Sequence, residues 1–171
     1  MQRVLNRMVL VLGLLTALLG GVGAGTASAA APVVRITNNL TGGSLMPQDY
    51  GANSNDGIAV YAWDPSDTRG ADLWRVEFTT DGYNVIRNIR TGKCLKPGGN
   101  FEGETFLSQG TCSTSLEFLW SLKHRVTDDT YKIKSVSSGQ VLAPYEVDLN
   151  QVVVLEADTN IAKNWWSVDE I

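Results

Sequence analysis

The residue types best suited to recognise a polar ligand gather between positions 48 and 63. Gln48 and Asp49 offer an amide and a carboxylate at the start of this stretch, and Tyr61 and Trp63 offer two flat aromatic rings at its end. A sugar site needs both elements, because an aromatic face lies against the apolar side of the sugar ring while fixed donors and acceptors bind its hydroxyl groups. Carbohydrate binding is therefore the chemistry that this stretch could perform.

Catalysis has little support in the sequence. His124 is the one histidine, it lies in the basic triplet 123–125, and no Gly-x-Ser-x-Gly motif supplies a nucleophile. The 18 acidic residues offer many carboxylate pairs for glycoside hydrolysis, but no spacing singles out one pair. A metal site is not expected from one histidine and two cysteines. We expect a protein that is not an enzyme and has no cofactor.

Residues 1–29 predict a signal peptide. Arg3 and Arg7 form a basic start, residues 8–19 are an apolar run too short to cross a membrane comfortably, and Ala27-Ser28-Ala29 matches a signal-peptidase site. Cleavage after Ala29 would leave residues 30–171, which suffice for one domain with its own core. We expect a secreted, extracellular protein without a membrane-inserted segment.

The charge of the chain argues against nucleic acid as a partner. Cleavage would remove two of the 14 basic residues and leave 12 against 18 acidic ones, a net charge of −6. A nucleic-acid-binding protein needs the opposite sign and a clustered basic face. The one basic cluster is the triplet 123–125, which we expect to lie in a solvated loop.

The two cysteines predict one disulfide. Cys94 and Cys112 are the only cysteines, and in an exported chain such a pair usually forms a bond, with two buried thiols as the alternative. They are 18 positions apart, so closing this loop would stabilise the fold by roughly 3 kcal/mol in the chain-entropy treatment.

The sequence contains an internal repeat of three units, approximately residues 33–80, 83–127 and 130–171. Trp74, Trp120 and Trp166 are spaced by 46 and 46 positions, and the turn glycines at 42, 92 and 139 by 50 and 47. A leucine follows each glycine by three positions. A repeat of this length is one supersecondary unit that cannot bury its apolar face alone. We expect the three tryptophans to fill a shared core.

Alternation of apolar and polar residues predicts four short strands in each unit. Strands are expected at residues 33–38, 58–63, 73–78, 83–89, 105–108, 118–122, 131–136, 140–145, 151–157 and 165–168, with a further short strand after the turn glycine of each of the first two units. No segment has an apolar period of 3.6 residues, so we expect almost no helix. Three such units suggest a barrel with pseudo-three-fold symmetry, because closure removes exposed strand edges.

The pattern resembles the ricin-type β-trefoil family. TGKCL at 91–95 with the later cysteine at 112 is similar to the family's cysteine pair, and ADLWRV, EFLWSL and KNWWSV are similar to its unit endings. The resemblance covers the mature chain and implies an all-β fold, a β-trefoil of three four-strand repeats. It is strongest to the lectin-like A and C subunits of cytolethal distending toxins and to secreted actinobacterial lectins. The glutamine that usually ends each unit is replaced by Asp72, Phe118 and Asn164.

In this family each unit can form one sugar pocket, from an acidic residue after its second strand and an aromatic residue that ends its third. The first of these positions holds no acid but Met46, Lys96 and Ala143. The second holds Trp63, Gly110 and Glu156. The resemblance therefore implies one pocket, in the first unit.

In that pocket Trp63 would be the stacking platform. Asp49 or Asp72 would accept hydroxyl hydrogens, and Tyr61 and Gln48 would lie beside them. The alternative is that Trp63 only covers the side of the barrel and that the acidic loop is solvated.

The resemblance implies a lectin-like carbohydrate-binding module without catalytic activity, whose partner is a carbohydrate or glycoconjugate. The alternative is a non-catalytic cell-binding or delivery subunit of a secreted toxin-like complex. In that case an aromatic surface of Tyr50, Tyr61 and Trp63 would bind a separate toxin-like protein chain or a lipid-borne glycan. A trefoil protease inhibitor is a third alternative, for which no loop signature is present.

Overall fold

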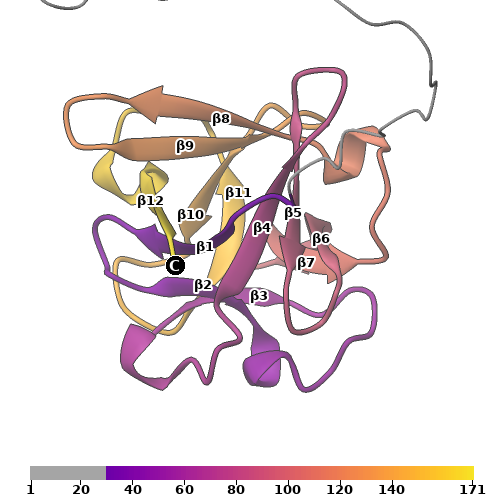
Figure 1. The fold of residues 1–171 in the computed structure, drawn as a ribbon. Helices are drawn as coiled ribbons and strands as arrows, with labels where there is room; N and C mark the ends of the chain where they lie inside the picture. Colours follow the sequence, from indigo (N-terminus) through magenta and orange to yellow (C-terminus); the bar gives the residue numbers. More distant parts are fainter. Residues whose placement is uncertain (1–29) are drawn as a thin grey trace, which may run out of the picture.

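The computed structural model describes residues 30–171, and the predicted signal peptide lies outside them. Within residues 30–171 the chain forms twelve strands and four short 3-10 turns (Figure 1). The strands are β1 Val33–Asn38, β2 Ser44–Pro47, β3 Val60–Trp63, β4 Leu73–Phe78, β5 Asn84–Asn88, β6 Cys94–Phe101, β7 Glu104–Gly110, β8 Trp120–Arg125, β9 Thr130–Ser135, β10 Val141–Pro144, β11 Gln151–Glu156 and β12 Trp166–Glu170. The turns are η1 Gln48–Gly51, η2 Pro65–Asp67, η3 Leu116–Phe118 and η4 Ala162–Asn164. The predicted all-β class with three four-strand repeats is confirmed.

The first and last strands of the three units close a six-stranded antiparallel barrel. Within the units β1 pairs with β4, β5 with β8 and β9 with β12, and the pairs β4–β5, β8–β9 and β12–β1 join one unit to the next. The middle strands form the hairpins β2–β3, β6–β7 and β10–β11. Strand β11 also pairs with β3 and β7, so the three hairpins support one another. Closure leaves the barrel without a free edge.

The three tryptophans form the centre of the core, as predicted. Each is fully buried, and each indole N–H donates to the backbone oxygen of the leucine three positions after the turn glycine of its unit. These bonds are Trp74 to Leu45 at 2.7 Å, Trp120 to Leu95 at 3.2 Å and Trp166 to Leu142 at 3.1 Å. The polar end of each ring is thus satisfied inside the core, which removes the cost of burying an unpaired donor.

The turn after the first strand has the same construction in each unit. Gly42, Gly92 and Gly139 have φ values of 73°, 67° and 72°, and their N–H groups donate to the backbone oxygen four residues earlier. Glycine adopts this left-handed conformation at no steric cost. In the first two units the side-chain oxygens of Asn38 and Asn88 also accept two backbone N–H groups. The turn starts the second strand at the same point in each unit.

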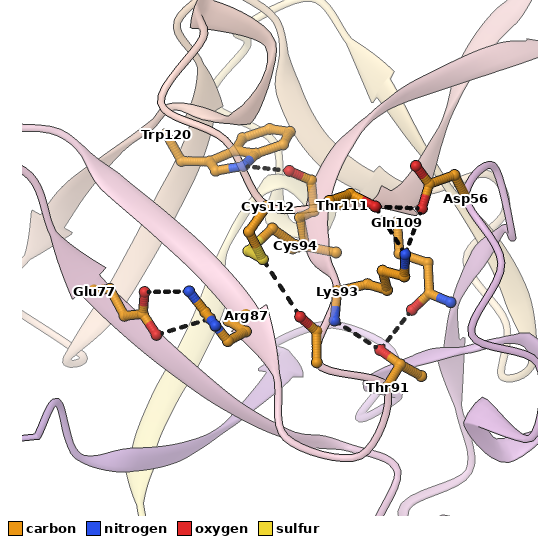
Figure 2. The surroundings of a disulfide bond; sticks show 12 residues. Asp56, Glu77, Arg87, Thr91, Lys93, Cys94, Gln109, Thr111, Cys112 and Trp120 are labelled. Carbon is orange, nitrogen blue, oxygen red and sulfur yellow. Dashed lines mark hydrogen bonds and ion pairs between the residues drawn. A yellow bond between two sulfur atoms is a disulfide. The ribbon is translucent and has the colours of Figure 1, made fainter.

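The predicted disulfide is confirmed. Cys94 begins β6 and Cys112 follows β7, and their sulfur atoms are bonded with the Cα atoms 4.9 Å apart (Figure 2). Beside the bond, the Lys93 ammonium group contacts Asp56 and Thr111, each at 2.8 Å. These contacts tie a loop of the first unit to the second unit.

The basic triplet 123–125 does not lie in a loop, as the sequence suggested, but at the end of strand β8. His124 stacks on Tyr131 with a centroid separation of 4.7 Å and bonds to Asp129 at 2.7 Å. The guanidinium of Arg125 lies 3.9 Å from the centroid of the Trp165 ring. The triplet is positioned by aromatic neighbours that come from β9 and from the end of the third unit, which local sequence does not show.

Candidate functional site

A pocket with a volume of about 330 Å³ opens beside the β2–β3 hairpin of the first unit. Its lining residues come from β2, η1 and β3 and are Met46, Gln48, Asp49, Tyr50, Tyr61 and Trp63. Tyr61 and Trp63 are two positions apart on β3, so they point to the same face, while Val60 and Ala62 point into the core. Pairing of Met46 with Tyr61 brings the end of β2 to the same place.

The Trp63 ring stands at a steep angle to each of the two tyrosine rings of the pocket. The ring centroids of Tyr50 and Trp63 are 6.1 Å apart with an interplanar angle of 73°. Those of Tyr61 and Trp63 are 6.2 Å apart with an angle of 80°. Each of the two tyrosine rings thus packs nearly perpendicular to the Trp63 indole. This arrangement offers one flat face with two aromatic flanks.

The Tyr50 side chain is fixed by a second loop. Its hydroxyl donates to Asp67 at 2.9 Å, and the Arg69 guanidinium lies 4.1 Å from its ring centroid. Arg69 also pairs with Asp67 at 3.2 Å. The hydrogen bond to Asp67 raises the pKa of Tyr50, and the same bond is the main reason that the pKa of Asp67 is lowered. Tyr50 is therefore held as a neutral donor beside an ionised acceptor.

The backbone of η1 is strained where it enters the pocket. Asp49 has φ 54° and ψ 37°, and Tyr50 has φ 55° and ψ 28°, so two consecutive residues with side chains are left-handed. Such a conformation costs on the order of 1 kcal/mol or more for each residue. Gly51 follows with φ 67° and is buried against the side chains of Thr91 and Arg90. The second unit thus supports this turn.

The carboxylate of Asp49 is exposed, and within residues 30–171 it forms no ion pair or hydrogen bond. Gln48 is exposed beside it. Asp49 is the one charged side chain among those that line the pocket. The pocket therefore combines aromatic faces with a carboxylate and an amide that are free to bind a ligand.

Asp72, the alternative acceptor, does not belong to this pocket. Its side chain is fully buried and forms an ion pair with Arg35 on β1. The position lies two residues before the core residue Trp74, where the chain passes inside the fold. A buried, paired carboxylate is not available to the hydroxyl groups of a surface ligand, so Asp72 serves the fold instead.

The corresponding positions of the other two units can be compared by strand register. Trp63 pairs with Ser44, Gly110 with Cys94 and Glu156 with Val141, and each partner lies two residues after its turn glycine. The three positions implied by the family resemblance are therefore equivalent, including Glu156 in the third unit.

In the second unit the equivalent region is closed by the chain itself. Lys96 pairs with Glu117 at 2.9 Å, and its ammonium group lies 5.4 Å from the ring centroid of Phe118. A Cβ atom on Gly110 would lie 2.8 Å from the Lys96 side chain. The lysine thus covers the place where an aromatic ring would be needed.

In the third unit Glu156 is also engaged. It pairs with Lys163 at 2.7 Å and accepts a hydrogen bond from the buried Asn164 side chain. Both partners of the ion pair are less than one fifth exposed. Of the three equivalent third-strand positions, the first unit alone has an aromatic ring, Trp63, and the carboxylate that stands there in the third unit is paired.

Two of the lining residues, Tyr50 and Met46, are not among the residues predicted above to contact a sugar. Tyr50 was expected only as part of a partner-binding surface, and Met46 only as a replacement for an acid. The strand pairing of Met46 with Tyr61 and the left-handed turn at Tyr50 bring both to the pocket. Neither feature follows from local sequence.

Other parts of the surface have different characters. A cavity of about 420 Å³ lies between the β4–β5 hairpin and residues 112–114, and Phe78 at its edge is 79% exposed.

Among residues 30–171, no three His, Cys, Asp or Glu side chains are placed to hold a metal ion. In the same range, no helix has the length and apolar character needed to cross a membrane.

The closed barrel, its three hairpins and the surface pocket define a β-trefoil of the lectin-like class. Residues 70–155 match the sequence model of the family described as "Ricin-type beta-trefoil lectin domain-like", and the chain belongs to this family. No curated protein sequence is similar enough to count as a relative.

Three solved structures illustrate the shared fold. The designed 3-fold symmetric protein ThreeFoil has a TM-score of 0.72 and 18% identity, over 81% of this chain and 99% of that one. The Haemophilus ducreyi cytolethal distending toxin has 0.66 and 18%, over 81% and 83%. The ricin B-like lectin of Macrolepiota procera, solved in complex with lactose, has 0.64 and 16%, over 85% and 100%. The predicted resemblance to toxin subunits and ricin-type lectins is confirmed at the level of fold.

Proposed function

We propose that this protein is an exported lectin that binds carbohydrate reversibly, without catalysis, through the pocket beside the β2–β3 hairpin of its first unit. The observation that carries the proposal is the pocket itself, in which Trp63, Tyr50 and Tyr61 surround a site bordered by the free carboxylate of Asp49. The ricin-type family and the lactose complex of the Macrolepiota procera lectin support carbohydrate as the ligand class.

Binding would use the two kinds of contact that a sugar offers. The apolar face of a pyranose ring would lie against Trp63, and the two tyrosine rings would contact its edges. Asp49 and Gln48 would accept hydrogen bonds from its hydroxyl groups. A single shallow site of this kind binds with a Kd of about 1 mM, or about −4 kcal/mol. Useful strength would come from several copies of the protein or of the ligand on one surface.

The direct test is a glycan array with the purified protein presented multivalently. We expect a coherent class of bound glycans, and Trp63→Ala should remove the signal because it removes the stacking face. Phe78→Ala is the matched control, since Phe78 is an exposed aromatic residue on β4 that does not line this pocket, and its removal should leave binding unchanged. A glycan signal that survives Trp63→Ala would place binding elsewhere and contradict this assignment.

A second function is favoured by the surface around Phe78. This ring is 79% exposed and borders the cavity of about 420 Å³ beside the disulfide, and exposed aromatic residues of this kind often anchor a protein partner. The alternative is therefore a non-catalytic cell-binding or delivery subunit that holds a separate toxin-like chain. Pull-down from the native secretome tests it: a stoichiometric partner that Phe78→Ala releases would support this role, and a monomer without partners would count against it.

A further inference from the structure

The charges around the pocket restrict the kind of sugar that it can take. Asp49 is the one charged residue of the lining. Arg69, which lies over Tyr50, is not part of the lining and is already paired with Asp67 at 3.2 Å. A carboxylate or sulfate on a ligand would thus meet a like charge at Asp49 and no cation within the pocket, so acidic sugars are disfavoured.

The aromatic walls favour the opposite charge. An ammonium group is attracted to the face of an aromatic ring within about 6 Å, and most strongly to tryptophan. Here an indole and two phenol rings surround one pocket, with a carboxylate at its border. An amine that entered this space could donate to Asp49 and Gln48, because an ammonium group has three donors to place. Rings and carboxylate together form a site for a cation.

In the other two units the equivalent region is closed by an ion pair of the chain itself. In the second unit the ammonium group of Lys96 lies over Phe118 and pairs with Glu117. In the third unit the ammonium group of Lys163 pairs with Glu156. Each closed region therefore contains an ammonium–carboxylate pair supplied by the chain.

The first unit lacks such an internal cation. Met46 stands where the second unit has Lys96, and Ala71 stands three residues before the unit's core tryptophan, where the third unit has Lys163. Asp49 supplies a carboxylate that no lysine or arginine of residues 30–171 neutralises. The place that a lysine fills in the other units is left for a ligand.

From these observations we infer that the pocket selects sugars that carry a free amino group, that is, unacetylated hexosamines. The inference rests on the proposed function, because it names the ligand class of the same site. The sugar ring would lie on Trp63, and its protonated amine would face the Tyr61 ring and pair with Asp49. The strained backbone at Asp49 and Tyr50 holds this carboxylate and the Tyr50 ring at the pocket.

Calorimetric titration of the purified protein would test the inference with a β-1,4-linked glucosamine trisaccharide and its N-acetylated counterpart. We expect the free amine to bind about ten-fold more tightly, as a charge-assisted contact would. Asp49→Asn should remove this difference, so that the variant binds the two trisaccharides with equal affinity. Asparagine accepts the left-handed backbone as readily as aspartate does, so the variant should keep its fold.

Equal affinity for the two trisaccharides would overturn the inference, and so would a preference that persists in Asp49→Asn. If both bind equally and Trp63→Ala abolishes both signals, the proposed function stands and only the amine selectivity fails. If neither trisaccharide nor any array glycan binds, the proposed function fails as well. Titration with choline is a further test. If choline binds as tightly as the glucosamine trisaccharide, the pocket is a cation site without sugar recognition, and the inference is overturned.

Discussion

The hydroxyl group of Tyr50 donates a hydrogen bond of 2.9 Å to Asp67, and this bond joins the two loops that flank strand β3. Tyr50 belongs to the loop before β3 and forms a wall of the pocket, whereas Asp67 belongs to the loop after it. Arg69 reinforces the contact because it pairs with Asp67 and lies over the Tyr50 ring. The shape of the pocket thus depends on an ionised carboxylate outside it.

The first prediction concerns the titration of this pair. Asp67 raises the pKa of Tyr50, so Asp67→Asn should lower that pKa toward the usual value for tyrosine. Tyrosinate absorbance measured during an alkaline titration reports the change, and Tyr50→Phe identifies the signal that belongs to Tyr50. A Tyr50 signal that does not move in Asp67→Asn would contradict the role of this hydrogen bond.

The pair should also make the pocket loop sensitive to acid. The pKa of Asp67 is lowered in the folded protein, so its contribution to stability is present above the usual aspartate pKa and is lost as the pH falls through the lowered value. The raised pKa of Tyr50 means that the contribution of the phenol is lost only as the pH rises through that raised value. Hydrogen exchange of residues 48–51, measured at decreasing pH in the protein and in Asp67→Asn, should show the acid-dependent opening only where Asp67 is present.

The second prediction concerns the strain at Asp49. Glycine adopts the left-handed backbone without steric cost, so Asp49→Gly should raise the free energy of unfolding by about 0.5 kcal/mol. The same substitution removes the carboxylate and should weaken binding of amino sugars. Denaturant unfolding and calorimetric titration measure the two effects. A loss of more than about 1 kcal/mol of stability would mean that the aspartate side chain supports the fold, and the strain argument would fail.

The third prediction concerns the disulfide. The bond closes a loop whose ends are 18 positions apart, so its reduction should lower the free energy of unfolding by roughly 3 kcal/mol. The double variant Cys94→Ala, Cys112→Ala should be less stable by a similar amount and should not respond further to reductant. Glycan binding should persist in both, because neither cysteine lines the pocket. Unchanged stability on reduction would show that the folded core alone constrains this loop.

The fourth prediction concerns export. The chain expressed in an actinobacterial host with the full sequence should be found in the culture medium with Ala30 as its first residue, since Ala27-Ser28-Ala29 matches a signal-peptidase site. N-terminal sequencing and intact mass measure this directly. A variant with Ala29→Arg should be processed poorly, because the cleavage site requires a small residue. An unprocessed chain that stays inside the cells would contradict export.

Sequence alone determined the parts of this protein that repeat. Equal spacing of Trp74, Trp120 and Trp166, with a turn glycine and a leucine at fixed distance, was enough to predict three four-strand units and a shared core. These features are local, because strand alternation and turn chemistry depend on near neighbours along the chain. The pairing of Cys94 with Cys112 was predictable for a different reason, since these are the only two cysteines.

The tertiary structure decided which of the candidate residues share the pocket. Asp72 and Asp49 are both acidic residues of the first unit, but Asp72 is buried against Arg35, 37 positions away, whereas Asp49 lies free at the surface. Similarly, Glu156 at the end of β11 forms an ion pair with Lys163 of η4. Whether a carboxylate is paired or free depends on which distant residue the fold brings to it, and strand pairing and barrel closure set that neighbour, not the residues beside it in the sequence.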